Sequence, residues 1–311
     1  KKDNQMLKVG FIGLGTMGFP IAGHISKSYK TLVFNRTINK SQKWTSEFEG
    51  EICESVKELA LKSKIIFLCL SEDRDIEEVV LGSDGILEHL NGRTIVVDHS
   101  TTSVDTATLI SRELLKKDSI FLDAPVSGGE AGAQNGTLSV MIGGDESAYK
   151  QISPILDCYS AFHKYMGISG NGQLTKMINQ ICIAGLLQAL AEAASFSKKS
   201  GISSKDVLDV ISKGAAQSWQ MENRWNSMID DKYNFGFAVD LMVKDLEIVS
   251  KFSKKIGANI SVTEMIKSYY KELQDMGAGK LDTSSLLKRL DEKDYNYCLL
   301  YTSDAADETV S

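Results

Sequence analysis

A run of glycines near the start of the chain has the spacing of a nucleotide-binding loop. The run is Gly13-Leu14-Gly15-Thr16-Met17-Gly18, which follows the apolar stretch Lys8–Ile12 and opens a helical pattern. The first glycine permits a tight turn, the second lets a pyrophosphate approach the backbone, and the third lets helix and strand pack closely. The N-terminus of the helix then points at the phosphates. We therefore predict a dinucleotide site built from these six residues.

Residues further along indicate which dinucleotide binds. About 20 residues after such glycines, an acidic side chain selects NAD, whereas an arginine accommodates the 2′-phosphate of NADP. This chain has Asn35, Arg36 and Thr37 at that place, without a carboxylate, and Lys40 follows. A guanidinium can bind a phosphate through two hydrogen bonds. We expect NADP(H) to be preferred and NAD(H) to remain possible; the alternative is a surface arginine at the end of a strand.

Polar residues also follow two later apolar stretches, Ile65–Leu70 and Ile95–Asp98. Ligands on open parallel sheets bind beyond the carboxyl ends of the strands. Leu70, Ser71 and Thr101 are therefore expected to line the cofactor, with Thr101 near the nicotinamide.

Two segments add groups that could act on a substrate. Ser127-Gly128-Gly129 can present a hydroxyl and successive backbone N–H groups to a carboxylate. Lys176 and Asn179 are three residues apart in a helical pattern and so share one face. Burial and the positive end of a helix both disfavour a charged lysine, so we expect a lowered pKa suited to acid–base catalysis. Without these neighbours, Lys176 would be interpreted as a surface lysine.

The elements that must position these residues alternate in the first half of the chain. Strands alternating with helices predict βαβ units and a mostly parallel sheet. The expected strands are Lys8–Ile12, Thr31–Phe34, Ile65–Leu70, Ile95–Asp98, Ile120–Asp123, Leu138–Ile142 and Phe162–Met166. The expected helices are Met17–Ser28, Ile38–Phe48, Asp75–Val80, Ser103–Lys116 and Glu146–Leu156.

After Gly167 the pattern is helical throughout. A long helix over Leu174–Lys199 is apolar on more than one face, as helices between domains or subunits are. The further expected helices are Ser204–Ser212, Met221–Met228, Ala238–Ile256, Val262–Met276 and Ser284–Leu290. The predicted fold is α/β: an N-terminal Rossmann-type doubly wound sheet (6–167), then an all-α C-terminal domain that includes the interdomain helix (168–293).

Composition restricts the partners. The net charge is −6 and no basic run occurs, so neither nucleic acid nor an anionic membrane is expected as a partner. No apolar run approaches the roughly 20 residues of a membrane span, and the start lacks the apolar core of a signal peptide. The five cysteines and four histidines show no metal-ligand spacing, so no metal is expected. We expect a cytoplasmic protein in which Cys69 and Cys182 are buried.

Together these motifs resemble the β-hydroxyacid dehydrogenase family. That family includes 3-hydroxyisobutyrate dehydrogenase, tartronate semialdehyde reductase and the glyoxylate and succinic semialdehyde reductases. The resemblance extends from about Lys8 to Leu290 in the same order. It is carried by the glycine motif, Asp123 to Gly129 with Gly132-Ala133 and Gly136-Thr137-Leu138, the Lys176/Asn179 segment, Phe237 and Leu241 with Lys244-Asp245-Leu246, and Gly277 to Ser285.

The resemblance implies a role for several residues. Lys176 would exchange a proton with the reacting oxygen, and Asn179 would hold that oxygen. Ser127, Gly128 and Gly129 would bind the carboxylate, while Lys244 would close the site and contact the cofactor. The chain departs from the family where Gln180 replaces a frequent second asparagine and Ser71 a frequent proline, and where a proline after Thr101 is missing.

The implied function is hydride transfer between NADP(H) and a small 3-hydroxy acid or semialdehyde. Reduction of succinic semialdehyde or glyoxylate is the leading expectation. The alternatives are 3-hydroxyisobutyrate dehydrogenase, 2-hydroxy-3-oxopropionate (tartronate semialdehyde) reductase, imine reductase and a non-catalytic NADP-binding assembly protein. The expected partner is a small carboxylate-bearing substrate, and the apolar long helix suggests a homodimer or homotetramer.

The end of the chain requires a separate interpretation. Residues 298–308, from Cys298 to Glu308, resemble the translation of a sequencing adapter, so we interpret 294–311 as a non-native tail. The alternative is a native polar tail. Met6 is a candidate for the natural start.

Overall fold

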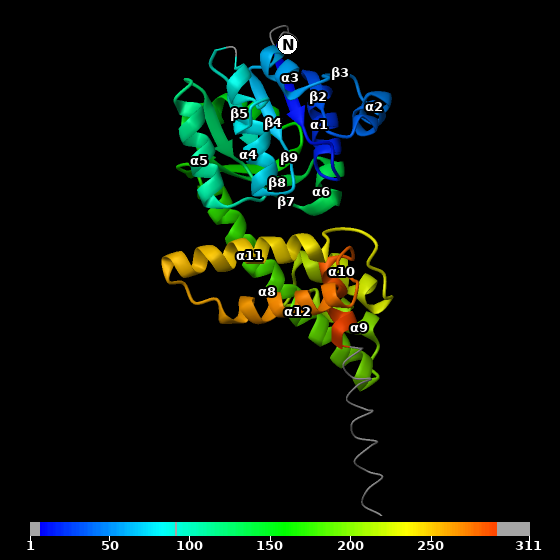
Figure 1. Cartoon of the computed structure of the whole chain (residues 1–311). Coiled ribbons are helices and arrows are strands. Elements are labelled where there is room, and N and C mark those ends of the chain that lie inside the picture. Colours follow the sequence, from blue (N-terminus) through cyan, green and yellow to red (C-terminus); the bar gives the residue numbers. More distant parts are fainter. Residues whose placement is uncertain (1–6, 91, 291–311) are drawn as a thin grey trace, which may run out of the picture. The chain divides into compact units, whose positions relative to one another are not determined.

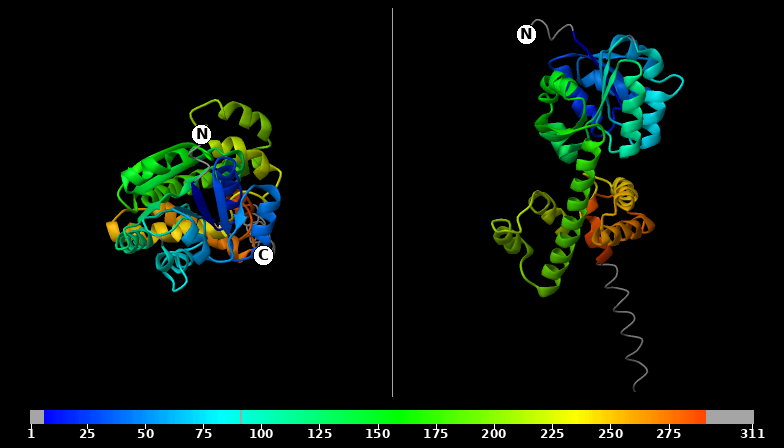
Figure 2. Two further views of the ribbon diagram at one scale, coloured as in Figure 1. Left: turned by 90° about the horizontal axis from the view of Figure 1, so that it is seen from above. Right: turned by 90° about the vertical axis from the view of Figure 1, so that its left-hand side faces the viewer.

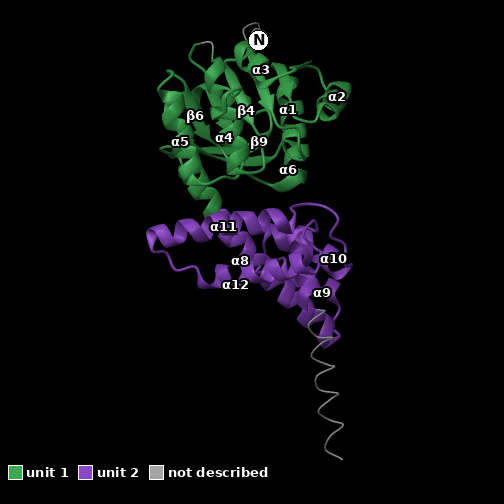
Figure 3. Ribbon diagram, in the orientation of Figure 1, with its two compact units in different colours: residues 1–178 green, residues 179–311 purple. Residues whose placement is uncertain are grey.

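The chain divides into two compact units, residues 1–178 and 179–311 (Figures 1 and 3). The computed structural model describes residues 7–90 and 92–290. The candidate start at Met6 and the adapter-like tail lie outside the described residues. The boundary between the units falls inside a long helix, at Ile178 and Asn179, whereas the change in sequence pattern comes after Gly167.

Unit 1 is built on a nine-stranded sheet. Its strands are β1 Lys8–Ile12, β2 Lys30–Phe34, β3 Glu51–Ile52, β4 Ile65–Leu68, β5 Ile95–Asp98, β6 Ile120–Asp123, β7 Val126–Ser127, β8 Leu138–Gly144 and β9 Ser160–Gly167. The order is β3-β2-β1-β4-β5-β6-β8-β7, with β9 paired to β8. Strands β1 to β6 pair in parallel. The order reverses between β1 and β4, which is the switch point where doubly wound sheets bind ligands.

Helices cover both faces of this sheet (Figure 2). They are α1 Gly18–Ser26, α2 Ile38–Glu47, α3 Val56–Lys62, α4 Asp73–Leu81, α5 Val104–Leu115, α6 Gly129–Asn135 and α7 Glu146–Leu156, with a short 3₁₀ turn, η1, at Leu87–His89. Side chains alternate between the two faces along each strand. Phe67 packs in the core beneath α1, α2, α6 and α7, whereas Ile66 and Leu68 pack beneath α3, α4 and α5.

Unit 2 is helical in its described residues. The chain enters it through α8, Asn171–Ser200, and continues through α9 Ser204–Ile211, α10 Trp219–Ile229, α11 Val239–Ile256, α12 Ser261–Asp275 and the 3₁₀ turn η2 Thr283–Ser285. Its core gathers apolar residues of α8, α10, α11 and α12 around the buried Trp225 and Tyr270. Among the described helices, α8 alone is long and apolar enough to cross a membrane. In its most apolar window, 44% of the residues are buried inside the structure.

The structure confirms the α/β fold with a long helix and a helical second part, and corrects the expectation that Cys69 and Cys182 are both buried. Cys182 is exposed rather than buried, because it lies on the side of α8 opposite the core-facing Ala184 and Leu187. Cys69 is half-buried, and burial raises the pKa of its thiol to about 12. The sequence interpretation also missed β3, β7, α3 and α6.

Candidate active site

The glycine loop between β1 and α1 shows why each glycine is needed. Gly13 has a φ of +100°, and a Cβ there would collide with the carbonyl oxygen of Cys69. A Cβ at Gly18 would collide with the carbonyl oxygen of Gly13, so the helix packs directly on the turn. A Cβ at Gly15 would meet nothing within 4 Å. The loop therefore has a tight turn at Gly13, open space at Gly15 and close helix packing at Gly18, as a bound pyrophosphate requires.

Asn35 holds this loop against the end of β2. Its Oδ1 accepts a hydrogen bond from the Leu14 N–H at 2.9 Å, and its Nδ2 donates to the Thr37 carbonyl at 3.1 Å. Arg36 and Thr37 are exposed beside it. Arg36 forms no hydrogen bond or ion pair with another described residue, so its guanidinium is available to an anion at this edge of the sheet.

A cleft of about 620 Å³ adjoins the loop and is lined by Gly15, Thr16 and residues of α1, α2 and α6. Lys27, Lys40 and Lys43 lie on its wall. The chain as a whole is negative, so an anionic cofactor has to be attracted by local positive charge. Glu47 and Glu130 also line the cleft, so the three ammonium groups leave a small excess of positive charge next to the glycine loop.

The ends of β4 and β5 lie at the same edge of the sheet as the glycine loop, because β1, β4 and β5 are parallel neighbours. The Leu70 N–H donates to Ser100 Oγ at 2.8 Å, and the Ser100 N–H donates to Asp98 Oδ1 at 2.9 Å. Ser71 is exposed and Thr101 half-buried. Leu70 and Ser71 thus follow β4 and Thr101 follows β5, the two strands next to the switch point on the side away from β2.

His99 supports these loops from inside the sheet. Its Nδ1 lies 2.6 Å from the Ala124 carbonyl oxygen, and its Nε2 lies 2.7 Å from the Tyr159 hydroxyl. A carbonyl can only accept, so Nδ1 carries the proton and Nε2 accepts from the tyrosine. Burial lowers the pKa of His99 to about 4, so the ring is neutral near pH 7. We interpret it as a structural residue.

Two glycines form the turn that follows the short strand β7. Ser127 ends β7, and Gly128 and Gly129 follow with φ values of +128° and +63°, which side chains of L-residues rarely adopt. A Cβ at Gly129 would meet nothing within 4 Å, so its backbone is open to an approaching group. The geometry is compatible with carboxylate binding by this segment, which stays a prediction.

Asp123, at the end of β6, fixes the start of α8. Its Oδ1 accepts from the Gly170 N–H at 2.7 Å, and its Oδ2 accepts from the Gln173 N–H at 3.0 Å. A carboxylate at a helix N-terminus satisfies N–H groups that have no partner within the helix. Burial nevertheless raises the pKa of Asp123 to about 6, against the lowering effect of these N–H groups.

Gln173 makes the second attachment. It is fully buried; its Oε1 accepts from the Thr102 N–H at 3.1 Å, and its Nε2 donates to the Ser100 carbonyl at 2.8 Å. The start of α8 is therefore tied to the loop after β5 as well as to β6. Lys176 lies just beyond this doubly anchored turn and is buried, with 7% of its surface exposed.

Two predicted site residues, Asn179 and Lys244, belong to unit 2, where a chain of polar contacts joins them. Asn179 Nδ2 donates to Gln180 Oε1 at 2.8 Å, and Gln180 Nε2 donates to Asp245 Oδ2 at 2.8 Å. Lys244 Nζ lies 3.2 Å from Asp245 Oδ1. Gln180 and Asp245 are both buried, at 2% exposure.

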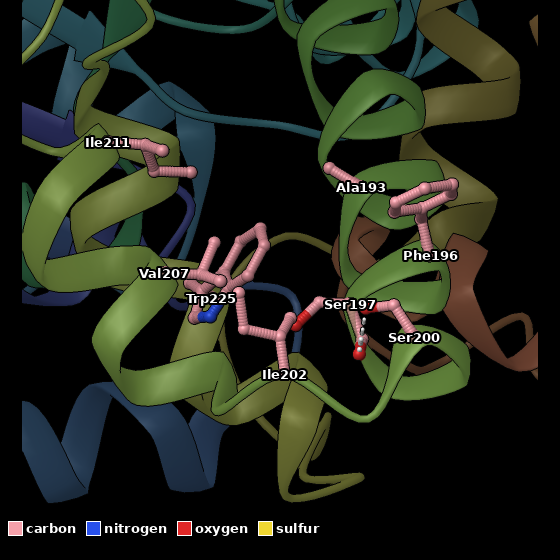
Figure 4. A pocket seen from close by; sticks show the side chains of 8 residues that line it. All are labelled: Ala193, Phe196, Ser197, Ser200, Ile202, Val207, Ile211 and Trp225. Atoms are coloured by element: carbon pink, nitrogen blue, oxygen red, sulfur yellow. Dashed lines mark hydrogen bonds between the residues drawn. The ribbon is translucent and has the colours of Figure 1, made fainter.

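Two further features of the described residues help to delimit the site. No group of three or more His, Cys, Asp or Glu side chains within residues 7–90 and 92–290 is placed to hold a metal ion. A second cavity of about 620 Å³ lies in unit 2 between the end of α8, α9 and α10 (Figure 4). Its walls are mainly apolar, with Phe196, Val207 and Trp225 among them, and none of the predicted site residues lines it.

The sequence interpretation missed the supporting roles of Asp123, Gln173 and Gln180. Asp123 was noted only as part of a motif, and Gln180 only as a departure from a family pattern. An acidic residue at a strand end is a signal for a helix cap, but its target lies 47 residues further along the chain. No local pattern reveals that pairing.

Comparison with known proteins gives the family. A profile for the NAD binding domain of 6-phosphogluconate dehydrogenase matches residues 8–170, and one for the NAD-binding of NADP-dependent 3-hydroxyisobutyrate dehydrogenase matches residues 170–290. An oxidoreductase of Shewanella frigidimarina is 46% identical over 92% of this chain and 99% of its own. The 2-hydroxy-3-oxopropionate reductase of Escherichia coli is 32% identical over 92% of this chain and 97% of its own.

The chain belongs to the β-hydroxyacid dehydrogenase family. A crystal structure of 3-hydroxyisobutyrate dehydrogenase from Salmonella typhimurium matches with a TM-score of 0.81 at 28% identity, over 91% of this chain and 99% of that one. The chain is accordingly an NAD(P)-dependent oxidoreductase that acts on hydroxyl groups.

Proposed function

We propose that this oxidoreductase uses NADP(H) and transfers a hydride to or from a small 3-hydroxy acid or semialdehyde, with Lys176 as its acid–base residue. One observation carries the proposal. Lys176 is buried next to the first turn of α8, and that turn is anchored by Asp123 and Gln173 to the strand ends that also carry the predicted cofactor loops. Burial disfavours the charged form of a lysine, and a side chain positioned beside a reacting group can exchange a proton with it.

The proposed chemistry divides between cofactor and protein. The nicotinamide supplies or takes the hydride. Lys176 donates a proton to the carbonyl oxygen in reduction and accepts the hydroxyl proton in oxidation. Ser127, Gly128 and Gly129 bind the carboxylate, Asn179 holds the reacting oxygen, and Lys244 contacts substrate and cofactor. These roles come from the family resemblance and from the residues' positions on β7, α6, α8 and α11.

The preference for NADP(H) over NAD(H) rests on the end of β2. Arg36 is exposed there, no carboxylate occupies the position that selects NAD, and Lys40 lines the neighbouring cleft. The cofactor residues in this proposal are the glycine loop, Asn35, Arg36 and Thr37, with Leu70, Ser71, Thr101 and Lys244.

Succinic semialdehyde and glyoxylate are the proposed substrates, in the direction of reduction. A specific observation favours a second candidate, because the 32% identical E. coli relative is a 2-hydroxy-3-oxopropionate reductase. 3-Hydroxyisobutyrate is a third substrate of the same class. The retained Lys176 argues against an imine reductase and against a protein that binds NADP only for assembly. We further propose a cytoplasmic homo-oligomer without nucleic-acid or membrane partners.

A substrate panel tests the proposal. Purified protein is mixed with NADPH and succinic semialdehyde, glyoxylate or tartronate semialdehyde, with NADP⁺ and 3-hydroxyisobutyrate, and with NADPH and a cyclic imine. We expect the highest kcat/KM for succinic semialdehyde or glyoxylate. A higher value for tartronate semialdehyde would favour the second candidate. Turnover of the imine alone, or NADPH binding without any turnover, would contradict the proposal.

A further inference from the structure

The polar chain in unit 2 has a fixed direction. An ionised carboxylate can only accept hydrogen bonds, so Gln180 must turn its NH₂ group toward Asp245 Oδ2, 2.8 Å away. This leaves the Gln180 oxygen to accept from the Asn179 NH₂ group, also at 2.8 Å. The carboxylate of Asp245 thereby determines the orientation of both side-chain amides, those of Gln180 and Asn179. A flipped amide at either position would set two donors or two acceptors against each other.

Because Gln180 and Asp245 are buried, reversing the direction of these hydrogen bonds would be energetically costly. Gln180 and Asp245 are each 2% exposed, so water cannot replace a lost partner. Asp245 Oδ1 accepts no hydrogen bond from a described residue, although Lys244 Nζ lies 3.2 Å away as an ion-pair partner. The carboxylate thus depends on Gln180 for its hydrogen bond at Oδ2. Removing a partner from a buried polar group costs more than the bond itself contributes.

We propose that Gln180 is a positioning residue that holds the Asn179 amide in one orientation for the reaction. The inference rests on the proposed function, in which Asn179 contacts the reacting oxygen. Gln180 itself is one residue further round α8 and acts through Asn179, not on substrate. Through Asp245 it also links Asn179 to Lys244, so the polar residues of two separate sequence motifs form one network. Pre-orientation of this kind lowers the cost of reaching the reactive geometry.

The most informative variant is Gln180→Glu, which keeps the shape of the side chain. When the new carboxyl group is protonated, its O–H can donate to Asp245 and its other oxygen can accept from Asn179, as glutamine does. When it is ionised, two buried carboxylates face each other and the network breaks. Like charges raise the pKa of such a pair. We therefore expect kcat of Gln180→Glu to approach that of the wild type at low pH and to fall progressively below it as the pH rises.

Two further variants complete the design. Gln180→Met removes both hydrogen bonds at similar volume, and we expect its kcat to be lower by about tenfold at every pH, as expected for a lost buried hydrogen bond. Gln188→Glu is the matched control. Gln188 lies on the same helix, is 6% exposed, and donates to a carboxylate, Glu192 Oε1, at 2.7 Å. This control should acquire a pH-dependent stability while its kcat follows the wild-type pH profile.

The outcomes separate the two proposals. Each variant is assayed beside the wild type for kcat and KM over pH, for NADPH affinity by fluorescence, and for its thermal midpoint. A fall of kcat with rising pH that occurs only in Gln180→Glu, with unchanged NADPH affinity, would support the positioning role. An active wild type whose kcat profile is unaltered by Gln180→Glu and Gln180→Met would overturn it and leave the proposed function standing. A wild type without activity on any carbonyl or hydroxy acid would overturn the proposed function, and the positioning role with it.

Discussion

At the residue scale, the proposed cofactor preference depends on a single guanidinium. Replacing Arg36 with alanine should raise KM for NADPH by about 10- to 100-fold, the effect of losing charge-assisted hydrogen bonds to a phosphate. KM for NADH should change little, since that cofactor has no 2′-phosphate. Steady-state assays with both cofactors measure the difference. Arg93→Ala, at an exposed arginine before β5, is a suitable control. Equal losses with both cofactors would argue against a phosphate contact.

His99 gives a prediction about stability rather than activity. Its pKa falls from 6.5 to about 4 on folding because the ring is buried. As the pH drops through this window, the unfolded chain takes up a proton that the folded protein does not, so the wild type loses stability. His99→Gln removes this linkage. Its destabilisation relative to the wild type should be largest near pH 7 and smaller by about 3 kcal/mol near pH 4.

Chemical denaturation of both proteins across this pH range measures the difference in unfolding free energy. A difference that stays constant with pH would show that the ring is not held neutral between Ala124 and Tyr159.

At the scale of the elements, two residues of the glycine loop should have different roles: Gly18 in stability and Gly15 in cofactor binding. Gly18→Ala would push a methyl group into the Gly13 carbonyl, so it should destabilise the protein by about 1–3 kcal/mol, as overpacking does. Gly15→Ala points its methyl group into open space and should leave the thermal midpoint unchanged. It should nevertheless weaken NADPH binding at least about tenfold, because the pyrophosphate needs that space. Normal NADPH affinity in Gly15→Ala would contradict the predicted position of the cofactor.

The same scale shows what a sequence can and cannot predict. Apolar runs gave β1, β5 and β6 with the bounds that the structure has, and α7 likewise. The edge strand β3 has two residues, too few for an alternating pattern. Helix α3 did carry a signal that was missed: Ser55 accepts from the Glu58 N–H, and Glu58 accepts from the Glu54 N–H, which is close to a capping box. Helix α6 follows Gly128, which has no side chain to cap it, so it lacked the signal that α3 carried.

The candidate site could likewise be predicted only in part from the sequence. Motif spacing placed the glycine loop, Asn35 and Lys176 on the elements where the structure has them. Asp123 and Gln180 could not be given roles from the sequence, because their partners are 47 and 65 residues away. Contacts of that separation depend on how strands and helices pack, which local patterns do not encode.

At the scale of the whole molecule, one exposed face of α8 is relevant to the oligomeric state of the protein. Cys182, Ala189, Ala193 and Phe196 are exposed apolar residues at helical spacing, and Phe196 is 76% exposed. A continuous apolar face on a helix is typical of an interface. We expect a dimer or tetramer in sedimentation velocity at micromolar concentration, and Phe196→Asp should shift it toward the monomer. A wild-type monomer would contradict the proposed oligomer.

The central claim is that Lys176 moves the proton during NADPH-dependent carbonyl reduction. The most direct test compares the wild type with Lys176→Ala and Lys176→Arg on the best substrate of the panel, after NADPH binding and thermal midpoint have been shown to be unchanged. We predict that kcat falls by about 10²- to 10⁴-fold in both variants, because alanine has no proton to give and arginine does not release one. Activity within a few fold of the wild type in Lys176→Ala would contradict the account.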